Sequence, residues 1–439
     1  MGTSAWMLAL LLVPGVDGSS ETPKKPPIKN GRVFSDTVKA AVDKAIGELD
    51  CPAPHIFHAN ESFIPTKRDL PNDYYLNCAD AIDLLIDTKS DVNEDLFNLA
   101  RTTKSLRVRY RVAFILTQRS CDHANAILEE MCASDNPKER YLAWHERCRA
   151  LSAKKLEPPR DFKSTLELHA VEKDKEVRDQ IESFWGQAKA KEAVPVLIKQ
   201  VQADPGYACP AIWALGEIGD PKAVPTLIKA FETDGNRHYH LEALGKLATP
   251  EAVDFIIEHL DEYGAVEALY ESKSDKALPA LEKHLEHLKE AGRKRDEMYI
   301  RATRIAIVRL RNKDPREQLL RIAEDEEEHA DMRFGALRAL QDYDAAAVES
   351  RILKIYTGSR DVDIKRCCIW LLENGKADGI TPAMLDHVLN CEGSENQDMG
   401  ATKYYLCEAL SKRLNKKFRK FEDLQVYAES VKKESGGSK

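Results

Sequence analysis

One short string returns along the middle of the chain at nearly constant spacing. The octamer AVPTLIKA begins at Ala223 and has counterparts that begin at Ala193, Ala252 and Ala277, so the intervals are 30, 29 and 25 residues. A second string, ALGEIGD from Ala214, keeps the same step. A period of this size marks a stacked array whose units are each too small to bury their apolar face alone. Two helices per period is the most economical interpretation.

Glycine and proline interrupt these strings, although a helix interior tolerates both poorly. Gly219 and the Asp220-Pro221 pair fit a boundary between two helices, because glycine favours a left-handed C-cap and proline suits the first turn of the next helix. Gly216 and Gly245 instead fall inside helices, where each costs roughly 1 kcal/mol relative to alanine. We therefore expect a neighbouring helix to pack closely against the bare backbone at both glycines.

Helical patterning continues on both sides of these strings, and no convincing alternating strand pattern follows them. The sequence predicts an all-α fold, an α-α superhelix in the form of a solenoid of antiparallel helix pairs. The repeat array is expected over 186–417, with a C-terminal helix and disordered tail at 418–439. Upstream, 36–185 is expected to be an N-terminal helical region of degenerate repeats or a capping bundle, after a Pro- and Lys-rich linker at 19–35.

Residues 1–18 contain an apolar run, Trp6 to Val13, that is too short to cross a bilayer. Pro14 and small residues follow the run, as in a signal peptide, but no Lys or Arg precedes it. If the run is a signal, the chain is exported to the periplasm or out of the cell. Otherwise the chain is cytoplasmic, and the segment is a disordered extension or a misassigned start. In an exported chain, Cys51 and Cys78 are the pair to test for a disulfide.

Composition narrows the class of partner. The formal net charge is -8, so no sequence-wide basic field attracts nucleic acid or an anionic membrane. No later segment is apolar enough to span a bilayer.

The ten cysteines have no regular spacing and do not form a disulfide framework. Cys367 and Cys407, for example, fall at helical apolar positions and are expected to be buried thiols.

The pattern ALGxIGDPxAVPxLI resembles the HEAT-repeat superfamily, within the armadillo/HEAT-like group, and most closely the short phycobilisome-lyase-type repeats. The residues that match as they stand are Ala214, Leu215, Gly216, Ile218, Gly219, Asp220, Pro221, Ala223, Val224, Pro225, Leu227 and Ile228. Residues 190–250 carry the resemblance, while 250–417 resembles the family by helix pairing only. The resemblance implies a superhelix whose concave face usually binds a protein, although the superfamily also includes enzymes.

One enzyme of the superfamily, deoxyhypusine hydroxylase, builds a di-iron site from His-Glu pairs on successive repeats. Here the only His-Glu dipeptide is His145-Glu146, and one pair does not hold two irons. The lyase-type relatives act on bilin chromophores, but the repeat spacing gives no sign of a chromophore pocket. Neither activity is expected, and the sequence indicates no cofactor.

Five metal-capable side chains lie within 28 residues, namely Cys121, His123, Cys132, His145 and Cys148. They lack the paired CxxC spacing of structural zinc sites. Cys121 and Cys132 are expected along one helix with both on roughly one face, which core packing explains equally well. No Gly-rich phosphate loop, GxSxG elbow or HExxH helix is present, so catalysis has no support in the sequence.

Charge supplies the candidate contact residues. Arg301 and Arg304 lie one helical turn apart beside the basic loop 293–295, and an acidic run occupies 324–329. Such runs are either solvated faces or a rim on which a charged partner segment docks. The residues that we single out as partner contacts are Arg237, Tyr239, Arg301 and Arg304.

The leading hypothesis is a non-enzymatic scaffold that binds a protein or peptide on the curved face of a HEAT-like solenoid. The alternative from another class is a HEAT-type metal-dependent enzyme or chromophore-handling protein with a site near Cys121–Cys148. A third is a self-associating structural element, and the oligomeric state is left open.

Overall fold

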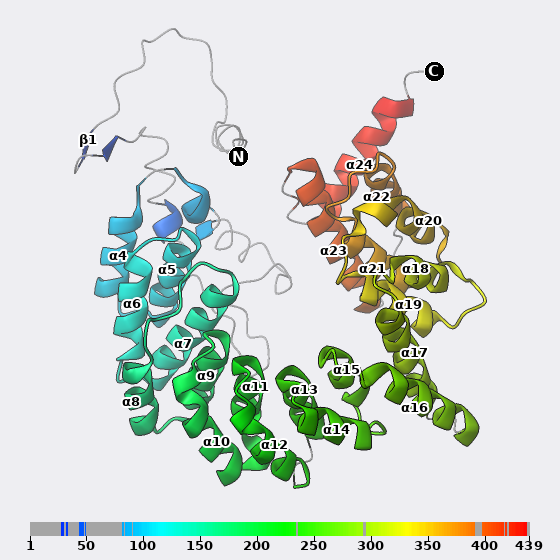
Figure 1. The fold of residues 1–439 in the computed structure, drawn as a ribbon. Helices are drawn as coiled ribbons and strands as arrows, with labels where there is room; N and C mark the ends of the chain where they lie inside the picture. The colour runs from blue at the N-terminus through cyan, green and yellow to red at the C-terminus, as the bar shows by residue number, and fades with distance from the viewer. Residues whose placement is uncertain are drawn as a thin grey trace. The chain divides into compact units, whose positions relative to one another are not determined.

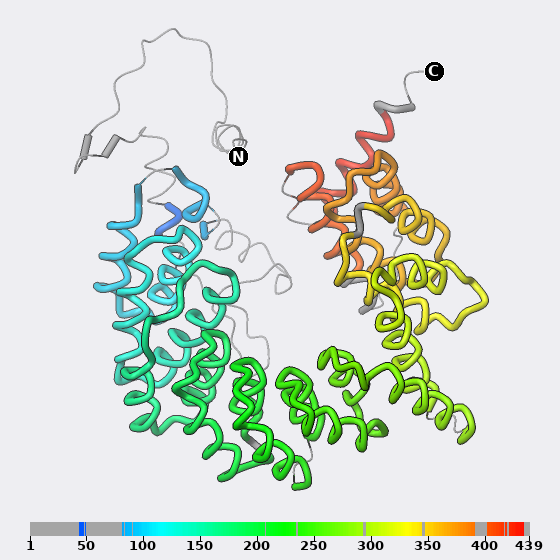
Figure 2. The backbone as a smooth tube through the Cα atoms, viewed as in Figure 1, coloured from blue at the N-terminus to red at the C-terminus, as the bar shows by residue number. Residues whose placement is uncertain are grey.

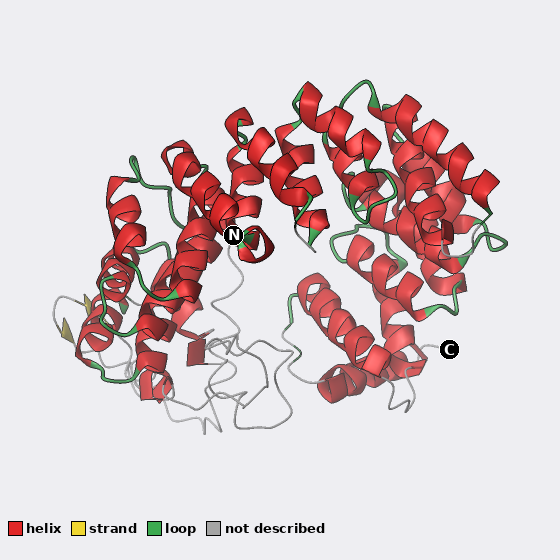
Figure 3. Ribbon diagram, turned by 90° about the horizontal axis from the view of Figure 1, so that it is seen from below, coloured by secondary structure: helices red, strands yellow, loops and turns green. Residues whose placement is uncertain are grey.

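The fold is built almost entirely of helices (Figures 1 and 3). The computed structural model describes residues 28–29, 32–33, 44–47, 49, 81–82, 84–89, 91–233, 236–292, 296–390, 397–416, 418 and 421–436. The strands within these ranges are β1 (Ile28–Lys29) and β2 (Arg32–Val33), which pair antiparallel. The expected signal at 1–18, Cys51 and Cys78 lie outside the described residues. The prediction of an all-α fold is confirmed.

The chain divides into two compact units, Met1–Pro195 and Val196–Lys439. In the first unit each helix packs against the next, α4 on α5, α6 on α7 and α8 on α9, and the second helices also stack, α5 on α7 and α7 on α9. The bounds are α4 (Asn93–Thr102), α5 (Leu106–Gln118), α6 (His123–Cys132), α7 (Pro137–Ser152), α8 (Lys163–Val171) and α9 (Lys175–Gln187). A 3-10 turn, η3 (Lys191–Ala193), then leads into α10 (Val194–Ala203).

The second unit repeats this plan, as the backbone tube shows (Figure 2). Its helices are α11 (Cys209–Ile218), α12 (Val224–Phe231), α13 (Arg237–Leu247), α14 (Pro250–Glu258), α15 (Ala265–Glu271), α16 (Ala277–Ala291), α17 (Glu297–Arg311), α18 (Arg316–Glu324), α19 (Ala330–Leu340), α20 (Glu349–Gly358), α21 (Val362–Leu372), α22 (Ile380–Asn390), α23 (Gln397–Leu414) and α24 (Phe421–Gly436). The odd-numbered helices from α11 to α23 stack in order, each on the next. We call these seven helices the odd layer.

Even-numbered helices flank the odd layer, with α12 packed on α13, α14 on α15 and so on to α22 on α23. Short 3-10 turns, η4 (Pro205–Tyr207), η5 (Pro221–Ala223) and η7 (Ala345–Val348), precede three of the helices. The last helix, α24, runs through Gly436, so residues 434–436, expected in a disordered tail, are helical. Lys433 lies in its last turn, where a cation stabilises the negative end of the helix dipole.

Residues 219–221 form the boundary between two helices that the sequence predicts. Gly219 ends α11 in the left-handed region with φ of +79°. The Asp220 side chain accepts a hydrogen bond from the Lys222 backbone N–H at 3.0 Å, and Pro221 opens η5, which runs directly into α12.

The same left-handed ending closes the second helix of several other pairs. The residues with positive φ within two positions of these helix ends are Ser120 after α5, Lys154 after α7, Lys189 after α9, Ala248 after α13 and Lys273 after α15. The sequence signals only Gly219, because the other positions hold residues that rarely adopt this conformation. The repeated turn therefore extends over both units. Within the described residues, no helix is long and apolar enough to cross a membrane.

Candidate functional site

In the first three helices of the odd layer, α11, α13 and α15, the backbones are in close contact. A Cβ atom added to Gly216 of α11 would lie 2.8 Å from Ala243 Cα of α13. One added to Gly245 of α13 would lie 2.5 Å from the Ala268 carbonyl oxygen of α15. Real Cβ atoms do not approach other atoms so closely, so only glycine fits at either position. The expected close approach is confirmed, and it fixes α11, α13 and α15 as one platform.

An aromatic edge lies where α13 and α15 begin. Arg237 Nη1 donates to Glu262 Oε1 at 2.5 Å, and the Arg237 guanidinium carbon lies 5.1 Å from the centre of the Phe231 ring. The His238 ring centroid is 4.1 Å from that of Tyr239 and 5.8 Å from that of Tyr263. Tyr263 itself is 64% exposed. The name aromatic edge refers below to Arg237, His238, Tyr239, Glu262 and Tyr263.

Two neighbouring helix pairs build this edge on a packed base. Phe231, which ends α12, contacts Phe255 and His259 of the next pair, with ring centroids 5.1 and 4.8 Å apart. Gly264, with φ of +86°, turns the chain into α15, and a Cβ there would lie 3.3 Å from His238 Cβ. The aromatic edge is therefore held in place by the packed rings of Phe231, Phe255 and His259 and by the turn at Gly264. The structure brings predicted contacts Arg237 and Tyr239 together here, with Tyr263, which sequence reasoning missed.

The predicted arginines of α17 lie elsewhere and are paired. Arg304 makes two hydrogen bonds to Glu328, at 2.6 and 3.3 Å, and this contact holds the pKa of the Glu328 carboxyl below its usual value. Arg301 lies 3.1 Å from Asp331. The basic patch and the acidic run, predicted as separate features, thus contact each other because α18 ends at Glu324 and the acidic loop turns back on α17. The loop 293–295 is outside the described residues.

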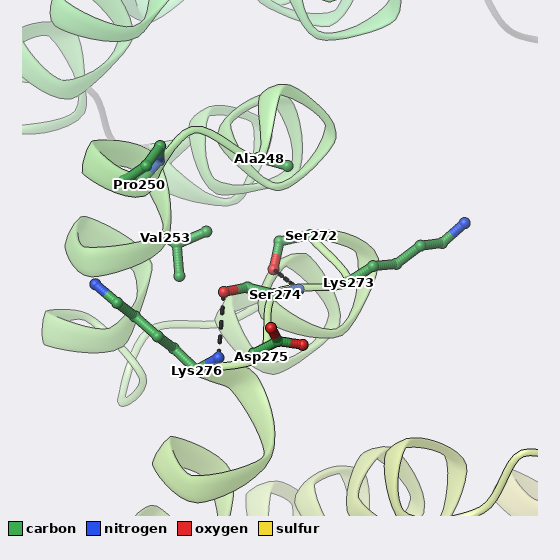
Figure 4. Close-up of a pocket in the computed structure, with 8 residues that line it drawn as sticks. All are labelled: Ala248, Pro250, Val253, Ser272, Lys273, Ser274, Asp275 and Lys276. Atoms are coloured by element: carbon green, nitrogen blue, oxygen red, sulfur yellow. Dashed lines mark hydrogen bonds between the residues drawn. The ribbon is translucent and has the colours of Figure 1, made fainter.

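A pocket of about 350 Å³ lies at the other ends of α13 and α15 (Figure 4). Its lining residues are Ala248, Pro250, Val253, Ser272, Lys273, Ser274, Asp275 and Lys276. Ser272 Oγ accepts from the Ser274 backbone N–H and Ser274 Oγ accepts from the Lys276 backbone N–H, each at 3.3 Å. The Lys276 ammonium also pairs with Asp254. These bonds fix a polar rim beside Val253, which forms the apolar side of the pocket.

Four of the five metal-capable residues of the first unit lie on two helices, His123 and Cys132 on α6 and His145 and Cys148 on α7. Cys121 precedes α6 and is not on it, so the prediction that Cys121 and Cys132 share one helix is wrong, because Asp122 occupies the N-cap position. His123 and Cys132 begin and end α6, about 14 Å apart along its axis. His123 Nε2 contacts Glu94 at 3.1 Å. Among the described residues, no group of three or more His, Cys, Asp or Glu side chains could hold a metal ion.

Cys132 and Cys148 are held in the thiol form. Burial raises the pKa of both Cys132 and Cys148 to about 12, whereas a metal ligand or nucleophile needs the thiolate. Cys148 Sγ donates to the Gln180 carbonyl at 3.7 Å. His145 Nδ1 lies 3.4 Å from the Tyr110 hydroxyl, and burial lowers the pKa of His145. These contacts are those of packed side chains.

Comparison with known proteins identifies the repeat. Residues 194–265 match the family model described as HEAT repeats. No curated protein matches the sequence significantly. A solved structure whose title states that Kap95p binding induces the switch loops of RanGDP to adopt the GTP-bound conformation contains a chain that is 13% identical, with a TM-score of 0.33. The alignment covers 86% of this chain and 56% of that one, so this chain spans little more than half of that length. Since the TM-score is below 0.5, no conclusion depends on this similarity.

Proposed function

We propose that this HEAT-repeat protein is a non-enzymatic scaffold that holds a protein or peptide partner on its odd layer. The observation that carries the proposal is the aromatic edge. Tyr263 is 64% exposed beside the ion-paired Arg237, and tyrosine and arginine are among the residue types that dominate interface energetics. An exposed aromatic ring on a fixed base is a typical anchor for a partner.

The platform beneath the edge supports the same proposal. Gly216 and Gly245 bring three odd-layer helices into backbone contact, so these helices are fixed relative to one another before a partner binds. Lower ordering cost gives tighter binding for the same contact area. The pocket at Ser272 and Lys276 lies at the opposite ends of two of these helices. We propose that an extended segment lies along α13 and α15, with Tyr263 at one end and the pocket at the other.

The test places the photo-cross-linking residue p-benzoylphenylalanine at position 263 of the full chain in its native host. We expect one discrete protein adduct after irradiation. The matched control places the same residue at Val426 of α24, which is 68% exposed and lies outside the aromatic edge. Equal adducts at both positions, or none at position 263, contradict the proposal.

The cross-linked partner is then purified and its affinity measured by calorimetry. We expect Tyr263→Ala and Arg237→Ala each to weaken binding at least tenfold, because truncating a central anchor costs roughly 1.4 kcal/mol or more. Val426→Ala should leave the affinity unchanged. If all three variants bind like the natural chain, the captured protein is not a partner of this edge.

Against the alternative, a metal-dependent enzyme or chromophore-handling protein with a site near Cys121–Cys148, stands the raised pKa of the Cys132 and Cys148 thiols. A separate proposal concerns localisation: the apolar run Trp6 to Val13 supports export, with cleavage before Ser19. Sequencing of the mature N-terminus should then begin at Ser19, and a mature chain that retains Trp6 would contradict export.

A further inference from the structure

Helix α15 presents two glutamates on the side that its neighbours leave open. Glu267 and Glu271 are exposed, while residues 265–266 and 268–269 are buried. The two glutamates are four positions apart on one face, about 6 Å apart along the helix axis. Neither carboxylate pairs with a cation in the described part of the chain. Both negative charges are therefore open to a partner.

The glutamates lie between the two features that the scaffold proposal uses. Tyr263 of the aromatic edge precedes Glu267 by four positions at the start of α15, and its ring is 64% exposed. At the other end of α15, Ser272 and Lys273 line the pocket. A segment that lies along α15 from the aromatic edge to the pocket therefore passes both glutamates.

The neighbouring helix α13 does not neutralise these charges. It packs against α15 (Figures 1 and 2), and the contact of Gly245 with Ala268 fixes their register. Lys246 is the lysine of α13, and its Nζ lies 2.6 Å from Glu242 and 2.8 Å from Glu217 of α11. Two carboxylates thus share the ammonium of Lys246.

The balance of charges around the glutamates is negative. Apart from histidine, the charged residues of 237–247 and 259–276 are the acids Glu242, Asp261, Glu262, Glu267, Glu271 and Asp275 and the bases Arg237, Lys246, Lys273 and Lys276. Arg237 pairs with Glu262, and Lys276 pairs with Asp254 of α14. Each arginine of the next odd helix, α17, also contacts a carboxylate. A negative surface of this kind selects a partner with positive charge.

We propose that the segment bound along α13 and α15 is a basic one, in which Lys or Arg side chains at alternate positions bind Glu267 and Glu271. Alternate side chains of an extended segment point to one side, about 6.6 Å apart, which matches the spacing of about 6 Å between the glutamates along α15. A third base, two positions further along, packs on the face of the Tyr263 ring, which attracts cations. The inference rests on the proposed scaffold function and adds the charge and spacing of the partner segment.

The test selects twelve-residue peptides from a random display library on the immobilised full chain. A selected peptide is synthesised with a fluorescein label, and binding is measured by anisotropy. We expect the selected sequences to contain Lys or Arg at two or more alternate positions. The double variant Glu267→Lys, Glu271→Lys should weaken binding at least tenfold. Raising NaCl from about 0.05 M to about 0.5 M should also weaken binding to the natural chain, because salt screens exposed charges.

A charge reversal makes the test specific. A peptide whose alternate bases are replaced by Glu should bind the double variant and not the natural chain. The matched control is Glu286→Lys with Glu290→Lys, which reverses two exposed glutamates four positions apart on α16 and should change affinity less than twofold. Circular dichroism confirms that each variant keeps its helix content.

Peptides without alternating bases, peptides that bind the double variant at full affinity, or an equal loss of binding in the α16 control overturn the inference. If the selected peptides bind the double variant but lose binding in Tyr263→Ala, the scaffold proposal stands and only the basic partner is wrong. If no peptide is selected, the inference is also wrong, while cross-linking at position 263 tests the scaffold separately.

Discussion

The helices α4 to α7 of the first unit and the helices α11 to α15 of the second follow one plan with different residues. In both regions the second helix of a pair stacks on the second helix of the next and ends in a left-handed residue. Three positions before that residue, α11 and α13 have Gly216 and Gly245, as α9 of the first unit has Gly186, whereas α5 and α7 have Thr117 and Leu151. The first unit instead fills its interior with large side chains, among them the fully buried Trp144.

The difference shows that helix pairs of this fold can pack in two ways, by backbone contact at glycine or by large side chains between the helices. Close approach of two backbones needs glycine at fixed positions. Because of this requirement, the central repeats can be recognised in the sequence. Where the position is not glycine, bulky residues of many kinds fill the interface, and they leave no fixed motif. The two regions should therefore respond in opposite ways to loss and to gain of side-chain volume.

The largest expected effect is the loss of bulk in the first unit. Trp144 is buried on α7 and packs at 5.1 Å, centroid to centroid, from Phe184. Trp144→Ala should lower the free energy of unfolding by about 3–5 kcal/mol, measured by urea denaturation. The control Trp370→Ala, on a partly exposed tryptophan, should cost far less, and equal losses would contradict the account.

Gain of bulk should damage the second unit. Gly245→Ala puts a Cβ 2.5 Å from a backbone oxygen of α15, so we expect a net loss of about 1–3 kcal/mol despite the better helix propensity of alanine. Gly335→Ala on α19 meets only Ile305 Cγ1 at 3.7 Å, and should raise stability by up to about 1 kcal/mol. Urea midpoints of the two variants must move in opposite directions.

A smaller effect on stability is expected at the left-handed helix ends, where glycine can be replaced in one unit and introduced in the other. Gly219→Ala forces a side chain to φ of +79° and should cost about 1–2 kcal/mol. Lys154→Gly relieves the same strain at φ of +55° and should add about 0.5–1 kcal/mol, since the strain exceeds the entropy cost of glycine. Thermal denaturation checks both, and a loss in both variants would show that the two turns are not equivalent.

The smallest effect is a dependence on pH in the first unit. Arg140 binds both oxygens of Glu172, at 2.7 and 2.8 Å, and this bond lowers the pKa of Glu172. A carboxyl with a lowered folded-state pKa stabilises the fold above its unfolded pKa of about 4.3, and loses that contribution as the pH falls. Hydrogen exchange of α7 should therefore rise at pH 3 more than intrinsic rates require.

The matched variant for this effect is Arg140→Gln. It should exchange faster than the natural chain at pH 7 and show a smaller additional change at pH 3, because Glu172 has lost the partner that shifts its pKa. An unchanged acid response in the variant would assign the effect to other carboxyls.

The sequence predicts the parts of this fold that depend on special residues. Gly216 and Gly245 are costly inside helices, so their presence indicates the close contacts with α13 and α15 that the structure has. The turns after α5 and α7 hold Ser120 and Lys154, which give no turn signal, so the corresponding repeats cannot be recognised from residue type.

The candidate site is harder to predict because its contacts join distant residues. Arg304 and Glu328 are 24 positions apart, and helical periodicity does not show that the loop between them turns back. Tyr263, which precedes Gly264 in a loop, left only a weak signal in the sequence.

The most direct test of the account is a measurement of the contact between α11, α13 and α15. Nuclear Overhauser spectra of the full chain with labelled alanine methyl groups and protonated glycine should show a strong signal between the Gly216 Hα atoms and the Ala243 methyl group, and another between the Gly245 and Ala268 Hα atoms. The account predicts both signals. Their absence, with the Ala243 methyl group in contact with large side chains instead, would contradict backbone contact as the basis of the platform formed by α11, α13 and α15.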